Sequence, residues 1–233
     1  MTNRTGLSGA IGLAALLAAC GGGGGARSGD DDAPIDSNTG GTGLDGPPVI
    51  PSASFFVTSV GNGSAAGNYG GVAGADTRCN TRATAGGLTG RTWHAYLSTS
   101  GDNARDRIGA GPWFNTHNEL IANNVAALHA NGIAAALVID ENGAAIDLVN
   151  AHDILTGSDQ EGRFSSSLPN CNGFTTNDPD VFTTVGHANG GGVGEGGVGG
   201  FVTASWNSAH ITQCDQVGMQ LTAGRAHLYC FAI

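Results

Sequence analysis

The positions of apolar residues predict three β-strands after residue 53. Residues 54–60 form an apolar run that predicts the first strand. Residues 92–98 alternate, with Trp93 on the apolar face, and predict a half-buried strand. Residues 227–233 alternate in the same way, so we expect a terminal strand that contains Cys230.

Two further segments have the spacing of amphipathic helices. Small apolar residues recur at every fourth position over 75–85, namely Ala75, Cys79 and Ala83, and Gly86-Gly87 would end that helix. The second helix is predicted by the capping box Thr116-x-x-Glu119. Apolar residues follow the box at helical spacing, and we expect this helix to end near Asn131-Gly132.

A β-hairpin is predicted around Asn142-Gly143, because this dipeptide favours a tight turn between two strands. The flanking strands would be residues 136–140 and 144–149. Helices and short strands occur without regular βαβ alternation. The pattern therefore indicates an α+β domain.

The N-terminus has the features of a targeting segment. An apolar stretch of residues 11–19 follows Arg4 and is too short to span a bilayer, which takes about 20 residues. It ends in Leu17-Ala18-Ala19-Cys20, which resembles the bacterial lipobox. The resemblance implies that residues 1–19 are a lipoprotein signal peptide and that the mature chain begins at a lipidated Cys20. Since Gly21 rather than Asp follows the cysteine, it also implies an outer-membrane address.

Residues 20–53 are predicted to be the lipidated cysteine and a disordered tether. After Cys20 the composition is dominated by Gly, Ser, Thr, Asp and Pro, with no aromatic residue before Phe55. Such a segment has too little apolar surface to offset the entropy of ordering. The folded domain is therefore expected to span residues 54–233.

Composition and charge restrict the partners of this domain. The chain of 233 residues has nine Arg, no Lys, 19 acidic residues and a net charge of −10. An acidic surface repels phosphate backbones and anionic headgroups, so the sequence argues against nucleic acid and against polybasic membrane docking. Contact with a membrane is expected through the N-terminal lipid alone.

Four cysteines lie in the predicted domain: Cys79, Cys171, Cys214 and Cys230. An even number in an exported chain predicts two disulfides, and the residues alone leave three pairings open. The spacings are too wide for a zinc ribbon. The seven His are scattered and form no His-Glu-x-x-His motif, so the sequence predicts no metal site and no cofactor.

Several short motifs in residues 55–233 resemble those of the endostatin domain and follow one another in the same order. The same pattern resembles that of an uncharacterised bacterial lipoprotein family. The motifs are Gly74-Ala75-Asp76-x-x-Cys79, Gly87-Leu88-x-Gly90, Ala95-Tyr96-Leu97-Ser98, Asn115-x-x-x-Glu119-Leu120, the Asp140 to Asp147 hairpin, Thr156-Gly157-Ser158-Asp159-x-x-Gly162-Arg163 and Tyr229-Cys230. The resemblance implies a C-type-lectin-like fold with a mixed, mainly antiparallel sheet and two helices. It also implies two nested disulfides, Cys79–Cys230 and Cys171–Cys214.

The binding properties of endostatin do not transfer with the fold. Its heparan sulfate site uses clustered arginines, whereas residues 54–233 hold 7 Arg against 14 acidic residues. Arg105 and Arg107 form the only close pair, and we expect surface or salt-bridging roles for them. Its zinc ligands lie in a His-rich N-terminal segment, and the equivalent region here has no His.

Trp206-Asn207 is the candidate ligand-binding segment. In calcium-dependent C-type lectins a Trp-Asn-Asp segment supplies calcium ligands that position a sugar, but here Ser208 replaces the Asp. Calcium prefers several oxygen ligands, so this substitution leaves a weak site at best. Trp206 is expected to be a core aromatic residue, with sugar stacking as the alternative. The Gly-rich residues 186–200 are the other candidate contact surface.

The sequence thus predicts a non-catalytic lipoprotein of the bacterial cell envelope. Its C-type-lectin-like domain would bind a glycan, a protein or an envelope component. The alternatives are a purely structural envelope protein and a hydrolase whose site is not recognisable from the sequence.

Overall fold

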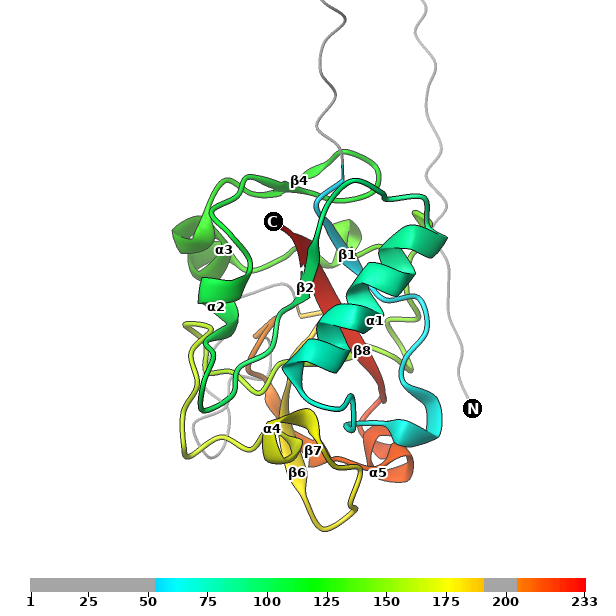
Figure 1. Cartoon of the computed structure of the whole chain (residues 1–233), viewed down its shortest axis with the longest axis vertical. Coiled ribbons are helices and arrows are strands. Elements are labelled where there is room, and N and C mark those ends of the chain that lie inside the picture. The colour runs from blue at the N-terminus through cyan, green and yellow to red at the C-terminus, as the bar shows by residue number, and fades with distance from the viewer. Residues whose placement is uncertain (1–52, 191–204) are drawn as a thin grey trace, which may run out of the picture. The chain divides into compact units, whose positions relative to one another are not determined.

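Strand β8 (Gly224–Ala232) is the central strand of the sheet in the computed structural model, which describes residues 53–190 and 205–233. It pairs antiparallel with β1 (Phe55–Val57) and with β2 (Trp93–Ala95). Its partner β5 (Asp153–Leu155) runs parallel to it. Figure 1 shows β8 in red beside β1 and β2, with the C-terminus at its end.

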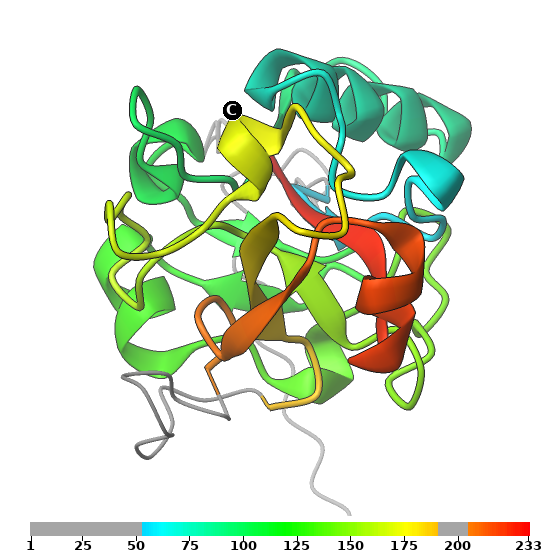
Figure 2. The ribbon, with the colours of Figure 1, turned by 90° about the horizontal axis from the view of Figure 1, so that it is seen from below.

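Strands β6 and β7 extend the sheet beyond β5. Strand β6 (Phe182–His187) pairs antiparallel with β5, and β7 (His210–Gln213) pairs antiparallel with β6. The resulting order is β1-β8-β5-β6-β7, with β2 also on β8. In Figure 2 these last strands are seen from below, beside the orange-red helix α5 (Gln216–Leu221). The sheet is mixed and the domain is α+β, as the sequence predicts.

Both faces of β8 are covered by apolar side chains. Successive residues of a strand point to opposite faces, so Leu228 and Cys230 enter one core cluster while Tyr229 and Phe231 enter the other. Helix α1 (Val72–Ala85) covers the first face (Figure 1). The second face is covered by α2 (Ala104–Arg107), α3 (Val125–Asn131) and the segments around them.

Helix α1 forms as predicted, because its buried residues are the ones at helical spacing, Ala75, Cys79 and Ala83. Both disulfides implied by the resemblance are present. Cys79 is bonded to Cys230 with an S–S distance of 1.97 Å, and Cys171 to Cys214 with 2.02 Å. The interval 171–214 lies inside the interval 79–230. The bonds tie α1 to β8, and α4 (Cys171–Phe174) to the end of β7.

The predicted capping box at Thr116 is wrong. Leu120–Ala122 forms strand β4, which pairs with β3 (Trp113–Phe114), and the helix α3 begins only after Asn124. The Asn124 side chain accepts a hydrogen bond of 2.9 Å from the backbone N–H of Ala127, so Asn124 is the N-cap. Strand pairing with β3 therefore overrides the helical spacing of these residues.

The predicted hairpin at Asn142-Gly143 is reduced to a turn. A single β-bridge joins Ile139 and Ala145, and one-turn helix η2 (Ala135–Leu137) replaces the first predicted strand. The Asp140 carboxylate accepts hydrogen bonds from the backbone N–H groups of Asn142 and Ala144, at 2.8 and 2.9 Å. These bonds satisfy the backbone N–H groups of the turn locally, so the turn does not depend on a ladder of strand hydrogen bonds.

Two other expectations need correction. The described residues contain five α-helices rather than two, because short α2, α4 and α5 lack the long apolar repeat that predicts a helix, and a further one-turn helix, η1, covers Gly63–Ala65. The segment of β2 is not half-buried, since Tyr96 and Ser98 on its second face are fully buried as well. That face meets the second core cluster instead of solvent.

Several predictions fall outside the described residues: the signal peptide 1–19, lipidation at Cys20, the tether up to Ser52, and residues 191–200 of the Gly-rich segment. Within the described residues, no helix has the length and apolar character needed to cross a membrane.

Candidate metal centre

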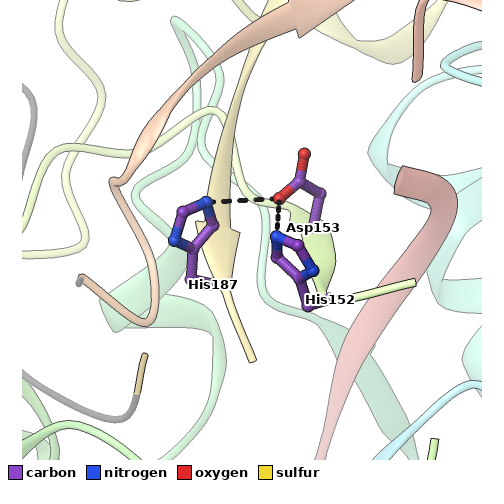
Figure 3. A group of neighbouring side chains, drawn as sticks. All are labelled: His152, Asp153 and His187. Atoms are coloured by element: carbon purple, nitrogen blue, oxygen red, sulfur yellow. Dashed lines mark ion pairs between the residues drawn. The ribbon is translucent and has the colours of Figure 1, made fainter. Parts of the chain in front are cut away.

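Three histidines surround one buried carboxylate where β5, β6 and β7 lie side by side. The carboxylate belongs to Asp153, the first residue of β5, and His152 precedes it directly. His187 ends β6 and His210 begins β7. Figure 3 shows the rings of His152 and His187 directed at one carboxylate oxygen of Asp153.

The strand register explains why these side chains meet. Asp153 is the Cα partner of His187 in the antiparallel pair β5–β6, so the two side chains share a face of the sheet. His210 is the partner of Val185, which lies two residues before His187 and hence on the same face. The topology alone therefore gathers a carboxylate and two imidazoles from three strands.

The distances place three imidazole nitrogens around the two carboxylate oxygens. His152 Nε2 lies 3.4 Å from Asp153 Oδ1, and His187 Nε2 lies 3.3 Å from the same oxygen. His210 Nε2 lies 3.3 Å from the other oxygen, Oδ2. The rings of His152 and His187 are edge-to-face with centroids 4.9 Å apart. The centroids of the His187 and His210 rings are also separated by 4.9 Å.

The carboxylate is buried without aligned hydrogen bonds. The Asp153 side chain is 0% exposed, and neither of its oxygens accepts a bond of hydrogen-bond geometry from the described residues. His187 Nε2 and His152 Nδ1 are likewise buried and unpartnered. Buried polar atoms without a hydrogen bond are uncommon in native proteins, so four such atoms in one place call for an explanation.

Electrostatics keep the carboxylate ionised. Burial by itself would raise the pKa of Asp153, but the neighbouring imidazoles of His187 and His210 outweigh it and lower the pKa to about 2. The contact with Asp153 raises the pKa of His210 in return. The group at the centre of the cluster is therefore an anion at neutral pH.

Backbone contacts hold the cluster in position. The N–H of Ala188 donates to the carbonyl oxygen of His152 at 2.8 Å, and the N–H of His187 donates to that of Ser205 at 2.9 Å. Gly186 allows the second contact, because a Cβ there would lie 1.9 Å from the carbonyl oxygen of Trp206. The glycine before His187 thus lets β6 approach the segment that contains Trp206.

The geometry matches the coordination shell of a small divalent metal ion. For a tetrahedral Zn²⁺ ion with ligands at about 2.0–2.1 Å, the ligand atoms are about 3.3 Å from one another. The contacts of His152 and His187 with Oδ1 have this length, and the ligand atoms of His152, Asp153 and His187 all lie within 4.8 Å of one another. Imidazole and carboxylate are ordinary ligands of zinc.

The structure gives the predicted ligand-binding pair, Trp206 and Asn207, a place in the core. Trp206 is 0% exposed and packs against Tyr96 and Tyr229, with ring centroids 4.8 and 5.4 Å apart. Asn207 is buried as well, and its Nδ2 donates to the Tyr96 hydroxyl at 2.9 Å. Trp206 thus has the core position that the sequence favours over sugar stacking, and the Asn207 side chain is buried beside it.

Arg105 and Arg107 make contacts within the fold, as the sequence predicts. Arg107 pairs with Asp76 of α1 at 2.6 Å, and Arg105 donates to the carbonyl oxygen of Glu161 at 2.9 Å. All four cysteines of the domain are bonded in the two disulfides.

No sequence pattern assigns any of the four cluster residues to a site. The adjacent pair His152-Asp153 is the one local signal, and it lies at the start of a strand of three residues that has no alternating pattern. His187 and His210 are 35 and 58 positions from His152 and become neighbours only through the sheet.

Compared with models of known protein families and with curated proteins, the chain matches none.

Proposed function

We propose that the chain is an envelope lipoprotein whose folded domain binds one divalent transition-metal ion, with Zn²⁺ as the best fit. The observation that carries this proposal is the buried, unpartnered Asp153 carboxylate with two imidazole Nε2 atoms at 3.3 and 3.4 Å from one of its oxygens. His152, Asp153 and His187 would hold the ion.

The chemistry of the ligands favours zinc over the hard cations. Calcium takes six to eight oxygen ligands and magnesium near-octahedral oxygen, whereas this cluster offers two nitrogens for every carboxylate. Imidazole suits Zn²⁺, Cu²⁺ and Ni²⁺, and metal availability chooses among them. A bound dication would supply the positive charge that the Asp153 carboxylate lacks.

Metal analysis of the purified full chain tests this proposal. After removal of metal and incubation with Zn²⁺, we expect one zinc per wild-type chain and a loss of stoichiometric zinc in the variants Asp153→Asn and His187→Gln. His117→Gln is the matched control, because His117 is exposed and lies outside the cluster. Wild-type protein without zinc, or Asp153→Asn with a full equivalent, would contradict the proposal.

The fold and anchoring of this lipoprotein are part of the same proposal. The α+β domain, its mixed sheet and the two disulfides support an endostatin-like, C-type-lectin-like fold. The lipobox at Leu17-Ala18-Ala19-Cys20 supports lipidation at Cys20 and display from the outer membrane. The domain would present its metal to a glycan, a protein or another envelope component, without catalysis.

A second candidate is favoured by the cluster itself. Two histidines and one carboxylate are also the ligand set of hydrolytic zinc enzymes, in which zinc activates a bound water. A zinc-dependent turnover of activated esters by the full chain, absent from Asp153→Asn, would support a hydrolase. Zinc binding without turnover would support the binding protein, and the absence of any ligand in a glycan and envelope-fragment screen would support a structural role.

A further inference from the structure

We propose that the metal ion keeps one coordination position for an anionic ligand from outside the chain, and that His210 positions Asp153 without binding the metal. This inference rests on the proposed metal function. It names the ligand class that the site would take: a small anion or a carboxylate group.

The number of protein ligands carries the first step. Tetrahedral zinc takes four ligands, and structural sites fill all four from the protein, whereas sites that bind external ligands keep one for water or substrate. Among the described His, Cys, Asp and Glu side chains around this cluster, the group with mutual ligand distances under 4.8 Å has three members: His152, Asp153 and His187. The described residues thus supply three of the four ligands and leave the fourth position open.

His210 is set apart from this group by its contacts. It faces Oδ2 at 3.3 Å, whereas His152 and His187 face Oδ1. Its other ring nitrogen, Nδ1, lies 3.0 Å from the carbonyl oxygen of Ile211. His210 Nδ1 thus has a partner in the protein, whereas His187 Nε2 is buried without a hydrogen bond.

This division suits a carboxylate that binds metal through one oxygen. A partner on the second oxygen fixes the orientation of a metal-binding carboxylate, and such outer contacts raise metal affinity about 10- to 100-fold. His210 would therefore hold the Asp153 plane so that Oδ1 points between His152 and His187. We call it a positioning residue for this reason.

The imidazole side of the cluster is partly exposed, whereas the carboxylate is covered. The side chains of His152, His187 and His210 are 19%, 15% and 30% exposed, and Asp153 is completely covered. Access to the ion from outside would therefore run past the ring edges, since His187 Nε2 and the carboxylate are themselves buried. A dication bound by two neutral imidazoles and one carboxylate has a net charge of +1, which favours an anion over a neutral ligand.

Cobalt substitution tests the inference on the full chain. We expect the visible absorption bands of the Co²⁺-loaded wild type to change in a saturable way on titration with sodium azide or sodium acetate. Sodium perchlorate at equal ionic strength is the control, because perchlorate coordinates metal ions only weakly. If cobalt binds but saturating azide leaves the bands unchanged, the position is closed and the inference is overturned.

The role of His210 is tested in parallel. We expect His210→Gln to keep the azide response and to bind cobalt about 10-fold more weakly, whereas His187→Gln loses the bands. Loss of the bands in His210→Gln to the same extent, with near-ultraviolet circular dichroism intact, would make His210 a ligand and overturn the positioning role. The azide titration of the wild type does not depend on any variant being folded. If the wild type binds no cobalt at all, the proposed metal function itself fails, which is distinct from a closed cobalt site.

Discussion

Cys79 in the middle of α1 is bonded to Cys230 in the central strand β8, across 151 positions of the sequence. The bond joins the helix to the strand that it covers, and both cysteines are fully buried. The helix therefore cannot separate from the sheet while the bond is intact. The second bond, between Cys171 and Cys214, closes a shorter loop of 43 positions.

We predict that the longer bond stabilises the domain more than the shorter one. The chain-entropy model gives about 5 kcal/mol for a loop of 151 residues and about 4 kcal/mol for one of 43. Urea unfolding of the double variants Cys79→Ser/Cys230→Ser and Cys171→Ser/Cys214→Ser measures both losses. A larger loss from the shorter bond would show that native packing around it, rather than chain entropy, sets the order.

Zinc should stabilise the folded domain. A ligand that binds only the native state at 100 times its dissociation constant raises the free energy of unfolding by about 2.7 kcal/mol. We therefore expect thermal unfolding of the full chain to shift upward with Zn²⁺ and to return on chelation. Asp153→Asn should show no shift, whereas His117→Gln should behave as the wild type does. An equal shift in Asp153→Asn would place the zinc elsewhere.

His129 predicts a loss of stability at mildly acidic pH. Its Nδ1 lies 2.8 Å from the Val125 carbonyl oxygen and its Nε2 lies 2.7 Å from the Tyr96 hydroxyl. With Nδ1 donating, Nε2 accepts the hydroxyl proton of Tyr96, a bond that the neutral ring alone can make. Burial lowers the pKa of His129, with a further contribution from Arg105.

The lowered pKa of His129 sets the direction in which stability changes with pH. The unfolded state takes up a proton near the ordinary histidine pKa of about 6.5, before the folded state does, so the stability present above this pH is lost as the pH falls toward the folded-state pKa. Urea unfolding at pH 7.5 and 5.0 should therefore show a larger loss for the wild type than for His129→Gln. Equal losses of stability in the wild type and in His129→Gln would show that His129 does not contribute to the pH dependence.

Lipidation at Cys20 predicts how the protein fractionates. A diacylated cysteine anchors a protein through about 0.8 kcal/mol per buried methylene, so the full chain is expected in the membrane fraction of a bacterial host. Cys20→Ser should appear in the soluble fraction and should retain the mass of the unprocessed chain. Ser28→Ala, in the same segment, is the matched control. Membrane association of Cys20→Ser would contradict the lipoprotein address.

The elements that the sequence predicts are those whose periodicity is long enough to be seen. Ala75, Cys79 and Ala83 mark α1, and the alternation in residues 227–233 marks β8. Leu120–Ala122 was misassigned because its apolar residues fit a helix and a strand equally, and only pairing with β3 decides between them. Local patterns contain no information about that partner.

The metal centre could not be predicted for a related reason. Asp153 lies in a strand of three residues, and His187 and His210 lie in strands whose other members are mostly Thr, Gly, Ile and Gln. No short motif links these segments, since His152-Asp153, His187 and His210 come from three separate parts of the chain. Trp206 is the opposite case: its apolar ring favours a core position, and the ring is buried against Tyr96 and Tyr229.

The position of β8 has a consequence for how the chain acquires its fold. Strands β1 and β2 lie far before β8 in the sequence, yet both pair with it, and β5 pairs with it as well. The sheet therefore cannot form until β8 has been synthesised, and contacts this distant in the sequence make folding slow. A variant that lacks residues 224–232 would have no strand with which β1, β2 and β5 could pair.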